Sequence, residues 1–341
     1  MFEDFEGFVS LRLKEVKMKY GIASVDGRGR PSEDRNFVRE LPGETMVAGV
    51  FDGHSGLSTV DFTLKMLPDV LVSSIGKISA NDVQNKAVIK PIFIEHDKKL
   101  ARQGALHYRD SGSTATVAFV TATHCVIAFV GDSPAFIIDP DTGKIITAIH
   151  KHEPTVPEEY KRIIANGGEV TNDDGDISRV NGCLAVSRAF GDFSLKFKNS
   201  RVPEWDTDWA TNFCVTADPD IVTIPRPVKG VLAIFSDGLV EQADGDGLKP
   251  LSDVAVLIQA SVREKKTLKE AADDVLRKHI AESVSSRAEY RGDDLTLVLV
   301  DIGLGAPKVM TGAGPKKVRA KTRKSVKHNA GTKKLLKTIY I

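Results

Sequence analysis

The chain has 341 residues, 41% of them hydrophobic and 27% charged, with a formal net charge of +1. This ordinary composition excludes collagen-like, low-complexity and wholly disordered proteins. No apolar run approaches the roughly 18 residues that span a bilayer, and the acidic start of the chain does not resemble a signal peptide.

The cysteines and the distribution of charge narrow the class further. Three cysteines form no CxxC pair, so we expect neither a disulfide scaffold nor a zinc site, and we predict an intracellular protein, cytoplasmic and/or nuclear. Eleven Lys or Arg and no acid lie in residues 303–341; subtracting them from +1 leaves −10 for residues 1–302. We therefore predict an N-terminal extension (1–19), one domain (20–302) and a basic, flexible tail (303–341). The tail is a solvated extension, a nuclear-import patch at Lys316–Arg319, or a contact for anionic partners.

The first half of the predicted domain opens with a strand and two helices. Thr45–Phe51 is short, rich in β-branched residues and followed by Asp-Gly, which predicts a buried strand. Helices are predicted near Gly56–Val72 and Asn81–Arg102. Pro68 and Pro91 lie inside these two segments, where we expect them to kink or break the helices.

Three further strands are predicted next, at Ser113–Thr121, His124–Val130 and Ala135–Ile138. Short turns separate them, the second at Gly131–Pro134. This spacing predicts a three-strand meander.

The second half alternates helices, a loop and strands. Pro157 suits a first helical position and Gly167-Gly168 a helix end. Residues 192–218 have no clear period and are predicted to form a long functional loop. Thr267-Leu-Lys-Glu270 is a capping box that opens another helix, and Val231–Phe235 and Leu295–Val300 are predicted strands. Hairpin-joined strands with helices in blocks predict an α+β fold of antiparallel sheets covered by helices.

Acidic residues recur where these strands begin or end. Asp52, Asp132 and Asp237 each follow a predicted strand, and Asp293 precedes one. Because neighbouring antiparallel strands bring a C-terminal end beside an N-terminal end, Asp293 could reach the same sheet edge as the others. Four converging carboxylates would repel one another, and divalent cations would relieve that repulsion.

The ligand chemistry of this edge favours Mg²⁺ or Mn²⁺, because all the candidate ligands are oxygens. Glu33 and Asp34 add two acids that face opposite ways on a strand, so we expect one to reach the metal and the other to support it. Any single Asp-Gly pair is explained by an ordinary turn. The spacing of an EF-hand calcium loop is absent, which argues against that kind of site. Spacing alone leaves a plain set of turns and a dinuclear site as open alternatives.

Nine stretches follow one another in an order that identifies a family. They are Gly27–Arg35 (GRGRPSEDR), Val50–Gly56 (VFDGHSG), Gly112–Ala115 (GSTA), Val130–Ala135 (VGDSPA), His152–Val170 (HEPTVPEEYKRIIANGGEV), Arg179–Asp192 (RVNGCLAVSRAFGD), Pro219-Asp220, Phe235–Leu239 (FSDGL) and Gly292–Thr296 (GDDLT). The sixth stretch alone is highly specific, and the set covers about residues 20–302. In these stretches the chain resembles the metal-dependent protein serine/threonine phosphatases of type 2C, the PPM family.

The resemblance implies a four-layer αββα sandwich of two antiparallel sheets flanked by helices, with a flap at about 192–218. It implies two bridged Mn²⁺ or Mg²⁺ ions and a weaker third site. Carried over by motif, the metal-site residues are Glu33, Asp34, Asp52, Gly53, Asp132, Asp237 and Asp293. Among these, Asp52 would bridge the metals, Gly53 would contribute its carbonyl, Asp34 would support from behind, and Asp132 would serve the third ion.

The implied activity is hydrolysis of phosphoserine and phosphothreonine in proteins by a hydroxide bridging the two ions. His54 would be the general acid for the leaving oxygen, because its near-neutral pKa suits that task. A turn histidine satisfied by the backbone is the alternative. His152 would orient its surroundings locally. The implied partners are phosphorylated protein substrates, with no membrane partner and a monomeric chain.

Three positions depart from the family pattern. The phosphate-binding arginine is replaced by Gly29, so that Arg30, or else Arg28, is expected to bind phosphate. Glu241 stands where a second Asp is usual, which bears on the accessory metal site, and Ser55 stands where glycine is usual.

Two other functions compete with an active phosphatase. A catalytically weak pseudophosphatase that binds phosphoproteins as a scaffold would explain the displaced arginine. A nucleic-acid-binding protein acting through the basic tail has no aromatic stacking or recognised module behind it.

Overall fold

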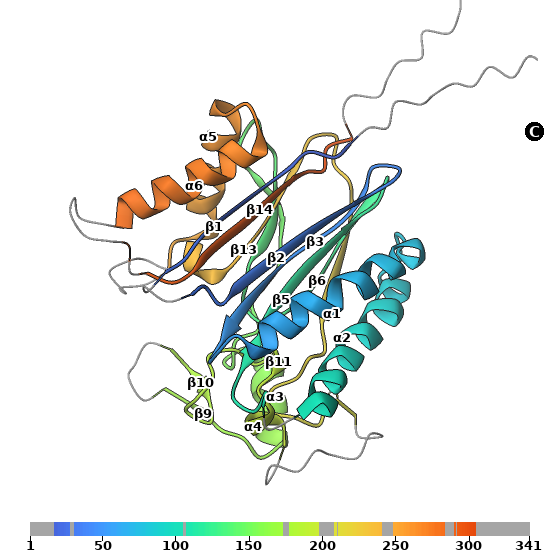
Figure 1. The fold of residues 1–341 in the computed structure, drawn as a ribbon, viewed down its shortest axis with the longest axis vertical. Helices are drawn as coiled ribbons and strands as arrows, with labels where there is room; N and C mark the ends of the chain where they lie inside the picture. The colour runs from blue at the N-terminus through green and yellow to red at the C-terminus, as the bar shows by residue number, and fades with distance from the viewer. Residues whose placement is uncertain are drawn as a thin grey trace, which may run out of the picture. The chain divides into compact units, whose positions relative to one another are not determined.

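The structure is a computed structural model, and it describes residues 17–27, 31–104, 107–172, 177–197, 208–209, 211–240, 248–283, 290 and 292–304. Within these residues, two antiparallel sheets pack face to face, and a helix pair covers each outer face (Figure 1). This confirms the predicted α+β, four-layer αββα sandwich. Within the part of the chain described, no helix is both long enough and apolar enough to cross a membrane.

One sheet has the order β1-β14-β13-β7-β8. Its strands are β1 (Tyr20–Val25), β7 (Ala135–Ile138), β8 (Ile145–Ala148), β13 (Val231–Phe235) and β14 (Leu295–Asp301). Helices α5 (Leu251–Glu264) and α6 (Leu268–Ser283) cover it.

The other sheet has the order β11-β4-β3-β5-β6-β12, with β2 also paired to β3. Its strands are β2 (Asp34–Leu41), β3 (Thr45–His54), β4 (Gly112–Ser113), β5 (Ala115–Val120), β6 (His124–Val130), β11 (Phe190–Gly191) and β12 (Asp220–Pro225). Helices α1 (Ser58–Ser74) and α2 (Asp82–Gly104) cover it, and a short 3₁₀ turn, η1 (Ile75–Lys77), follows α1.

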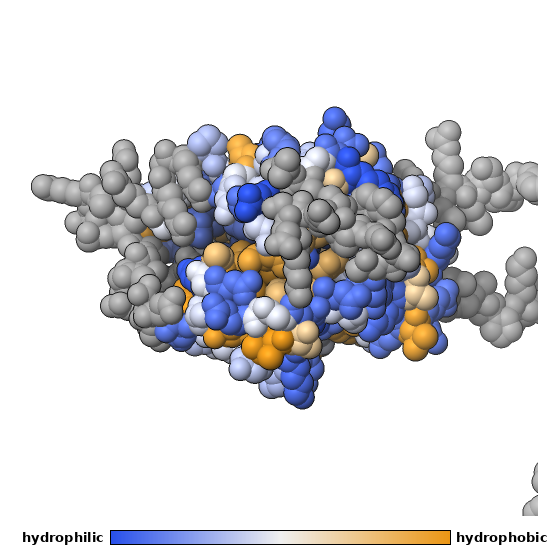
Figure 2. All heavy atoms as spheres, turned by 90° about the horizontal axis from the view of Figure 1, so that it is seen from below, coloured by the Kyte–Doolittle hydropathy of each residue, from blue (hydrophilic) through white to orange (hydrophobic). Residues whose placement is uncertain are grey.

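Smaller elements lie beside the sandwich. They are α3 (Pro157–Ala165), the paired strands β9 (Val170–Thr171) and β10 (Arg179–Val180), α4 (Phe193–Lys196) and the 3₁₀ turn η3 (Asp237–Leu239). Figure 2 shows the end of the domain that carries α3, β9, β10 and α4 in Figure 1; most of the coloured residues on this face are hydrophilic, and hydrophobic residues show near its centre and at places along its margin.

Strand β3 shows why the sandwich forms. Side chains alternate across a strand, so Met46, Ala48 and Val50 enter the core between the sheets. Val47 and Phe51 point the other way, into the core beneath α1 and α2. Burial on both faces explains why the strand is almost continuously apolar.

One sequence prediction about local structure is wrong. The segment 113–138 is not a meander: β5 and β6 pair with each other, but β7 pairs with β13 in the opposite sheet. The turn at 131–134, where Gly131 has a φ of +97°, carries the chain from one sheet to the other.

Pro68 and Pro91 were predicted to kink or break their helices. The helices are not broken, since α1 and α2 run past the two prolines, and a kink stays a prediction.

Other local predictions are confirmed. Pro157 is the first residue of α3. Thr267 and Glu270 form the capping box of α6: the Glu270 N–H donates to Thr267 Oγ1 and the Thr267 N–H to Glu270 Oε2, each at 3.1 Å.

The predicted long loop at 192–218 is partly ordered by aromatic packing. Phe197 stacks on Phe193 with ring centroids 4.9 Å apart and meets the edges of Trp209 and Phe213. All four rings are buried. The N-terminal extension up to residue 16, residues 198–207 of the flap and the basic tail from 305 on lie outside the described residues.

Candidate metal centre

The strand ends bring the predicted acids to one edge of the sandwich. Asp34 begins β2 and stands opposite Asp52 in the register of β2 and β3. Asp132 follows β6 and Asp237 follows β13. The Ser236 N–H donates to Thr296 O at 3.1 Å, which sets the end of β13 beside the start of β14, next to Asp293.

The carboxyl groups act strongly on one another. Burial raises the pKa of Asp52 well above its usual value, and the charges of Asp237, Asp34, Asp132 and Asp293 raise it further. Burial, together with the Asp237 charge, raises the pKa of Asp132 to about 7. In the folded protein without cations, these groups therefore resist ionisation at neutral pH.

Asp34 is one of the buried acids at this edge. Its Oδ2 accepts a hydrogen bond from Ser236 Oγ at 2.6 Å, while its buried Oδ1 has no hydrogen-bond partner among the residues that the structure describes. Burial raises the Asp34 pKa to about 7 in spite of the Ser236 bond. An unpartnered buried oxygen within a set of repelling carboxylates fits a hard divalent cation, which prefers oxygen ligands.

Gly53 and Glu33 meet through their backbones beside this cluster. The Gly53 N–H donates to Glu33 O at 3.1 Å, and a side chain at Gly53 would bring its Cβ within 2.7 Å of that oxygen. Glu33 Oε1 accepts from the Gly56 N–H at 2.7 Å. The lack of a side chain at Gly53 thus permits the strand end and the Glu33 segment to lie against each other.

His54 is held by a residue that sequence reasoning did not single out. Its Nε2 lies 2.9 and 3.0 Å from the two carboxylate oxygens of Asp192. Burial lowers the pKa of His54, but the charge and hydrogen bond of Asp192 and the charges of Asp132 and Glu33 together outweigh it, so the pKa rises overall. Asp192 ends the specific stretch 179–192, which was its only signal in the sequence.

Asp294 is a second residue missed by sequence reasoning. Its carboxylate is buried and accepts from the backbone N–H of Gly27 at 2.7 Å and of Glu33 at 2.8 Å. It thereby ties both sides of the segment 28–30 to β14. The sequence shows two adjacent acids in GDDLT. It does not show that the second, Asp294, holds the backbone of another segment.

The structure thus brings together Asp34, Asp52, Asp132, Asp237 and Asp293, with Glu33, Gly53 and His54 alongside. The metal-binding and catalytic roles of these residues stay predictions. The described residues do not include Arg28, Arg30 or Glu241. That Arg30, or else Arg28, binds phosphate therefore stays a prediction.

His152 belongs to a separate polar network. Its Nδ1 accepts a hydrogen bond from the Gly131 N–H at 3.1 Å, which braces the turn that carries Asp132. One ligand atom each from His150, His152 and Asp220 lie within 4.8 Å of one another. Because Nδ1 of His152 is an acceptor, Nε2 carries the proton of the neutral ring, which makes it a poor metal ligand.

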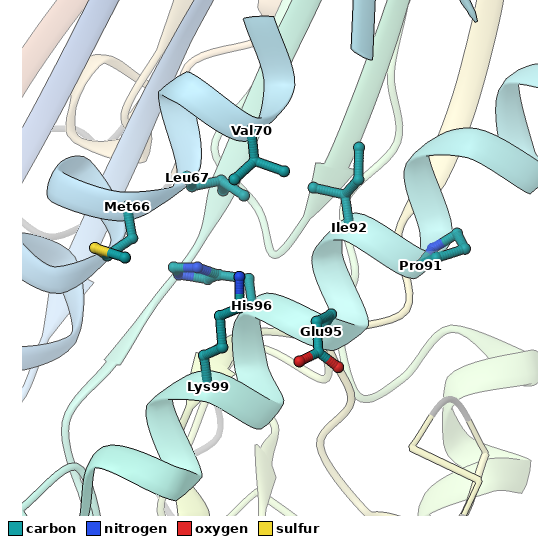
Figure 3. Close-up of a pocket in the computed structure, with 8 residues that line it drawn as sticks. All are labelled: Met66, Leu67, Val70, Pro91, Ile92, Glu95, His96 and Lys99. Atoms are coloured by element: carbon teal, nitrogen blue, oxygen red, sulfur yellow. The ribbon is translucent and has the colours of Figure 1, made fainter. Parts of the chain in front are cut away.

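An apolar cavity lies away from the acids, between α1 and α2. It has a volume of about 300 Å³ and is lined by Met66, Leu67, Val70, Pro91, Ile92, Glu95, His96 and Lys99. Figure 3 shows the His96 ring pointing from α2 into the space between the helices. His96 Nε2 bonds with Thr63 Oγ1 at 3.0 Å, so this histidine is satisfied within the helical layer.

Comparison with known proteins agrees with this geometry. A family model described as "Protein phosphatase 2C" matches residues 18–288. "Probable protein phosphatase 2C 55" of Oryza sativa subsp. japonica is 36% identical over 54% of this chain and 47% of its own length. "Protein phosphatase 1L" of Bos taurus is 30% identical over 64% of this chain and 58% of its own length. The chain therefore spans about half of these curated relatives.

A solved structure shares the fold. The "phosphatase from a pathogenic strain Toxoplasma gondii" superposes with a TM-score of 0.67 over 84% of this chain and 96% of that one, at 22% identity.

Proposed function

Because the chain belongs to the protein phosphatase 2C family, matched over residues 18–288, we propose that it is a metal-dependent phosphatase acting on phosphoserine and phosphothreonine in proteins. One observation carries the proposal: the carboxylates of Asp52, Asp132, Asp237 and Asp293 act on one another at one edge of the sandwich. Such an arrangement is costly unless cations occupy it.

The residues would divide the work of holding two Mn²⁺ or Mg²⁺ ions. Asp52 would bridge them, with Asp237, Asp293, Glu33 and the carbonyl of Gly53 completing the ligand set directly or through water. Asp34 would support from behind, and Asp132 would serve a weaker third site. Two such cations screen a phosphate dianion and lower the pKa of a water molecule between them.

His54 would protonate the departing seryl or threonyl oxygen. It follows Asp52 by two residues, and its Asp192 contact favours the protonated ring that an acid needs. An alkoxide is a poor leaving group, so this proton matters most for natural phosphoesters.

The test is turnover of a phosphothreonine peptide by the full chain with and without Mn²⁺. We expect Mn²⁺-dependent phosphate release that falls by roughly 10²–10³-fold in Asp237→Asn. Asp69→Asn, an exposed change on α1, is the matched control and should keep wild-type activity. Negligible Mn²⁺-dependent turnover by the wild type would contradict the proposal, and peptide binding without turnover would indicate the pseudophosphatase.

A further inference from the structure

Asp192 directs both carboxylate oxygens at one atom, His54 Nε2, at 2.9 and 3.0 Å. An ionised carboxylate only accepts, so Nε2 donates its proton to Asp192 and is unavailable to a substrate. We propose that Asp192 is a positioning residue that orients the His54 ring and leaves Nδ1 as the nitrogen that serves the leaving group. The inference rests on the proposed phosphatase function.

The position of Asp192 in the chain argues against an ordinary capping role. It is the N-cap residue of α4, where an Asp side chain normally accepts from the first backbone N–H groups. Here it makes no side-chain capping bond, and its carboxylate reaches His54, 138 residues earlier in the sequence, instead. The side chain is only 4% exposed, so the contact is shielded from water.

The backbone at Asp192 is held in an unusual conformation. Its φ is +50°, in the left-handed region that residues other than glycine, asparagine and aspartate rarely adopt. Its N–H donates to Ser111 O at 3.1 Å, and Leu195 N–H donates to its carbonyl at 2.9 Å. These bonds keep the residue in a conformation that aims its side chain at the ring.

A buried ion pair secures both sides of this turn. Asp97 on α2 accepts from the Gly191 N–H at 2.8 Å and from Lys196 Nζ at 2.7 Å. Lys196 Nζ also donates to Ala189 O at 2.8 Å, and both charged side chains are at most 1% exposed. The carboxylate of Asp192 is therefore presented by a braced segment.

Gly112 shows how tightly the pair is enclosed. A Cβ at this position would lie 2.1 Å from Asp192 Oδ2 and 2.2 Å from His54 Nε2. No side chain fits between the two groups and β4. A substitution at Gly112 therefore disturbs the pair without altering either of its members.

The proposed step balances as a hydrolysis. Water supplies its oxygen to phosphorus and releases one proton to solvent, the P–O bond to the serine or threonine breaks, and its electron pair stays on the departing oxygen. That oxygen takes a proton from Nδ1, while Nε2–H stays bonded to Asp192. The ring regains a proton from solvent, and the products are the free hydroxyl and inorganic phosphate.

The experiment compares two substrates that differ in their need for an acid. A phosphothreonine peptide releases a strongly basic alkoxide, whereas p-nitrophenyl phosphate releases a weakly basic phenolate. We expect Asp192→Ala to lower kcat on the peptide by roughly 100-fold with little change in KM, and kcat on p-nitrophenyl phosphate by less than about threefold. Asp192→Asn, which keeps one acceptor, should retain more peptide activity than Asp192→Ala.

Three further variants separate positioning from general damage. His54→Gln combined with Asp192→Ala should be no slower on the peptide than His54→Gln alone, because the two act as one unit. Gly112→Ala should reproduce the substrate-selective loss. Asp110→Asn, an exposed change in the same segment, is the matched control. Equal losses on both substrates, or additive losses in the double variant, would overturn the proposal.

A spectroscopic arm is independent of turnover. In ¹⁵N spectra of the histidine rings, with His54→Gln identifying the signal and the pH high enough for the ring to be neutral, the wild-type His54 should keep its single proton at Nε2, and Asp192→Ala should remove this preference. Unchanged ring-nitrogen shifts in Asp192→Ala would overturn the positioning role. A wild type that hydrolyses neither substrate would overturn the phosphatase function instead, with the spectra still deciding the role of Asp192.

Discussion

At the scale of single residues, the strand-end acids raise one another's pKa because they lie close together. Asp34 and Asp132 each have a pKa raised to about 7, burial being the main cause. Each would carry a negative charge in water at pH 7. Keeping these groups ionised therefore costs free energy, which a bound cation would offset.

Ser55 has a strained backbone conformation. Its φ is +56°, a conformation that glycine adopts at no steric cost, and glycine is the usual family residue there. The sequence identified Ser55 as a departure but could not show its conformation.

We predict that Ser55→Gly raises the free energy of unfolding by up to about 1 kcal/mol, because it relieves the left-handed strain of an exposed residue. Urea denaturation of metal-free protein measures it. Ser73→Gly, in the last turn of α1, is the control and should lower stability instead. A loss of stability in Ser55→Gly would show that the hydroxyl contributes more than the strain costs.

At the scale of elements, α3 depends on buried ion pairs. Glu159 accepts from Arg188 Nη2 at 2.7 Å and Arg162 Nη1 at 2.6 Å, and from Ser187 Oγ at 2.5 Å. Burial opposes ionisation of Glu159, but the two arginines lower its pKa from 4.5 to about 2.

This shift sets the sign of a pH dependence. Because the folded-state pKa lies below the unfolded one, the stability that Glu159 contributes is complete above about pH 4.5 and is lost as the pH falls toward about 2. Glu159→Gln should lower the free energy of unfolding by about 3–5 kcal/mol at pH 7, since it removes the acid that pairs with Arg162 and one of the two acids that pair with Arg188. In urea denaturation, the difference in free energy of unfolding between the wild type and Glu159→Gln should be smaller at pH 3 than at pH 7. Glu158→Gln, at an exposed position, should change the free energy of unfolding little at either pH. A free-energy difference that stays constant between pH 7 and pH 3 would show that ionisation of Glu159 does not contribute to stability.

Helix α2 offers an element-scale test of proline. Pro91 is exposed and lies inside the helix, where it leaves the Ala87 carbonyl without its N–H partner. We predict that Pro91→Ala raises the free energy of unfolding by about 1–3 kcal/mol in thermal or urea denaturation. Pro157→Ala, at the first position of α3, should change it little. A lower free energy of unfolding in Pro91→Ala would mean that packing of the proline ring stabilises the fold by more than the missing hydrogen bond costs.

Elements with a local signal were predictable from sequence. Ala135–Ile138 and Val231–Phe235 coincide with β7 and β13, because short apolar runs bounded by Gly, Asp or Pro have few alternatives. Strands β1 and β12 were missed, and neither is a continuous run of buried residues. The crossing from β6 to β7 was also missed, since strand pairing is a long-range property.

At the scale of the whole molecule, the two sheets make the site by bringing β3 and β6 from one sheet to the same edge as β13 and β14 from the other. Motif order predicted the αββα sandwich, and the metal-binding role that it assigns to the strand-end acids stays a prediction. It could not predict Asp192 or Asp294, whose partners His54 and Glu33 lie 138 and 261 residues away. Such pairings depend on tertiary packing, which a single sequence does not display.

Calorimetric titration of the full metal-free chain with Mn²⁺ tests the central claim most directly. We predict uptake of about two ions by the wild type, absent in Asp52→Asn and retained in Asp69→Asn, with metal-free Asp52→Asn no less stable than metal-free wild type because repulsion is relieved. A wild type that takes up no Mn²⁺, or an Asp52→Asn variant that binds as the wild type does, would contradict a metal centre at this edge.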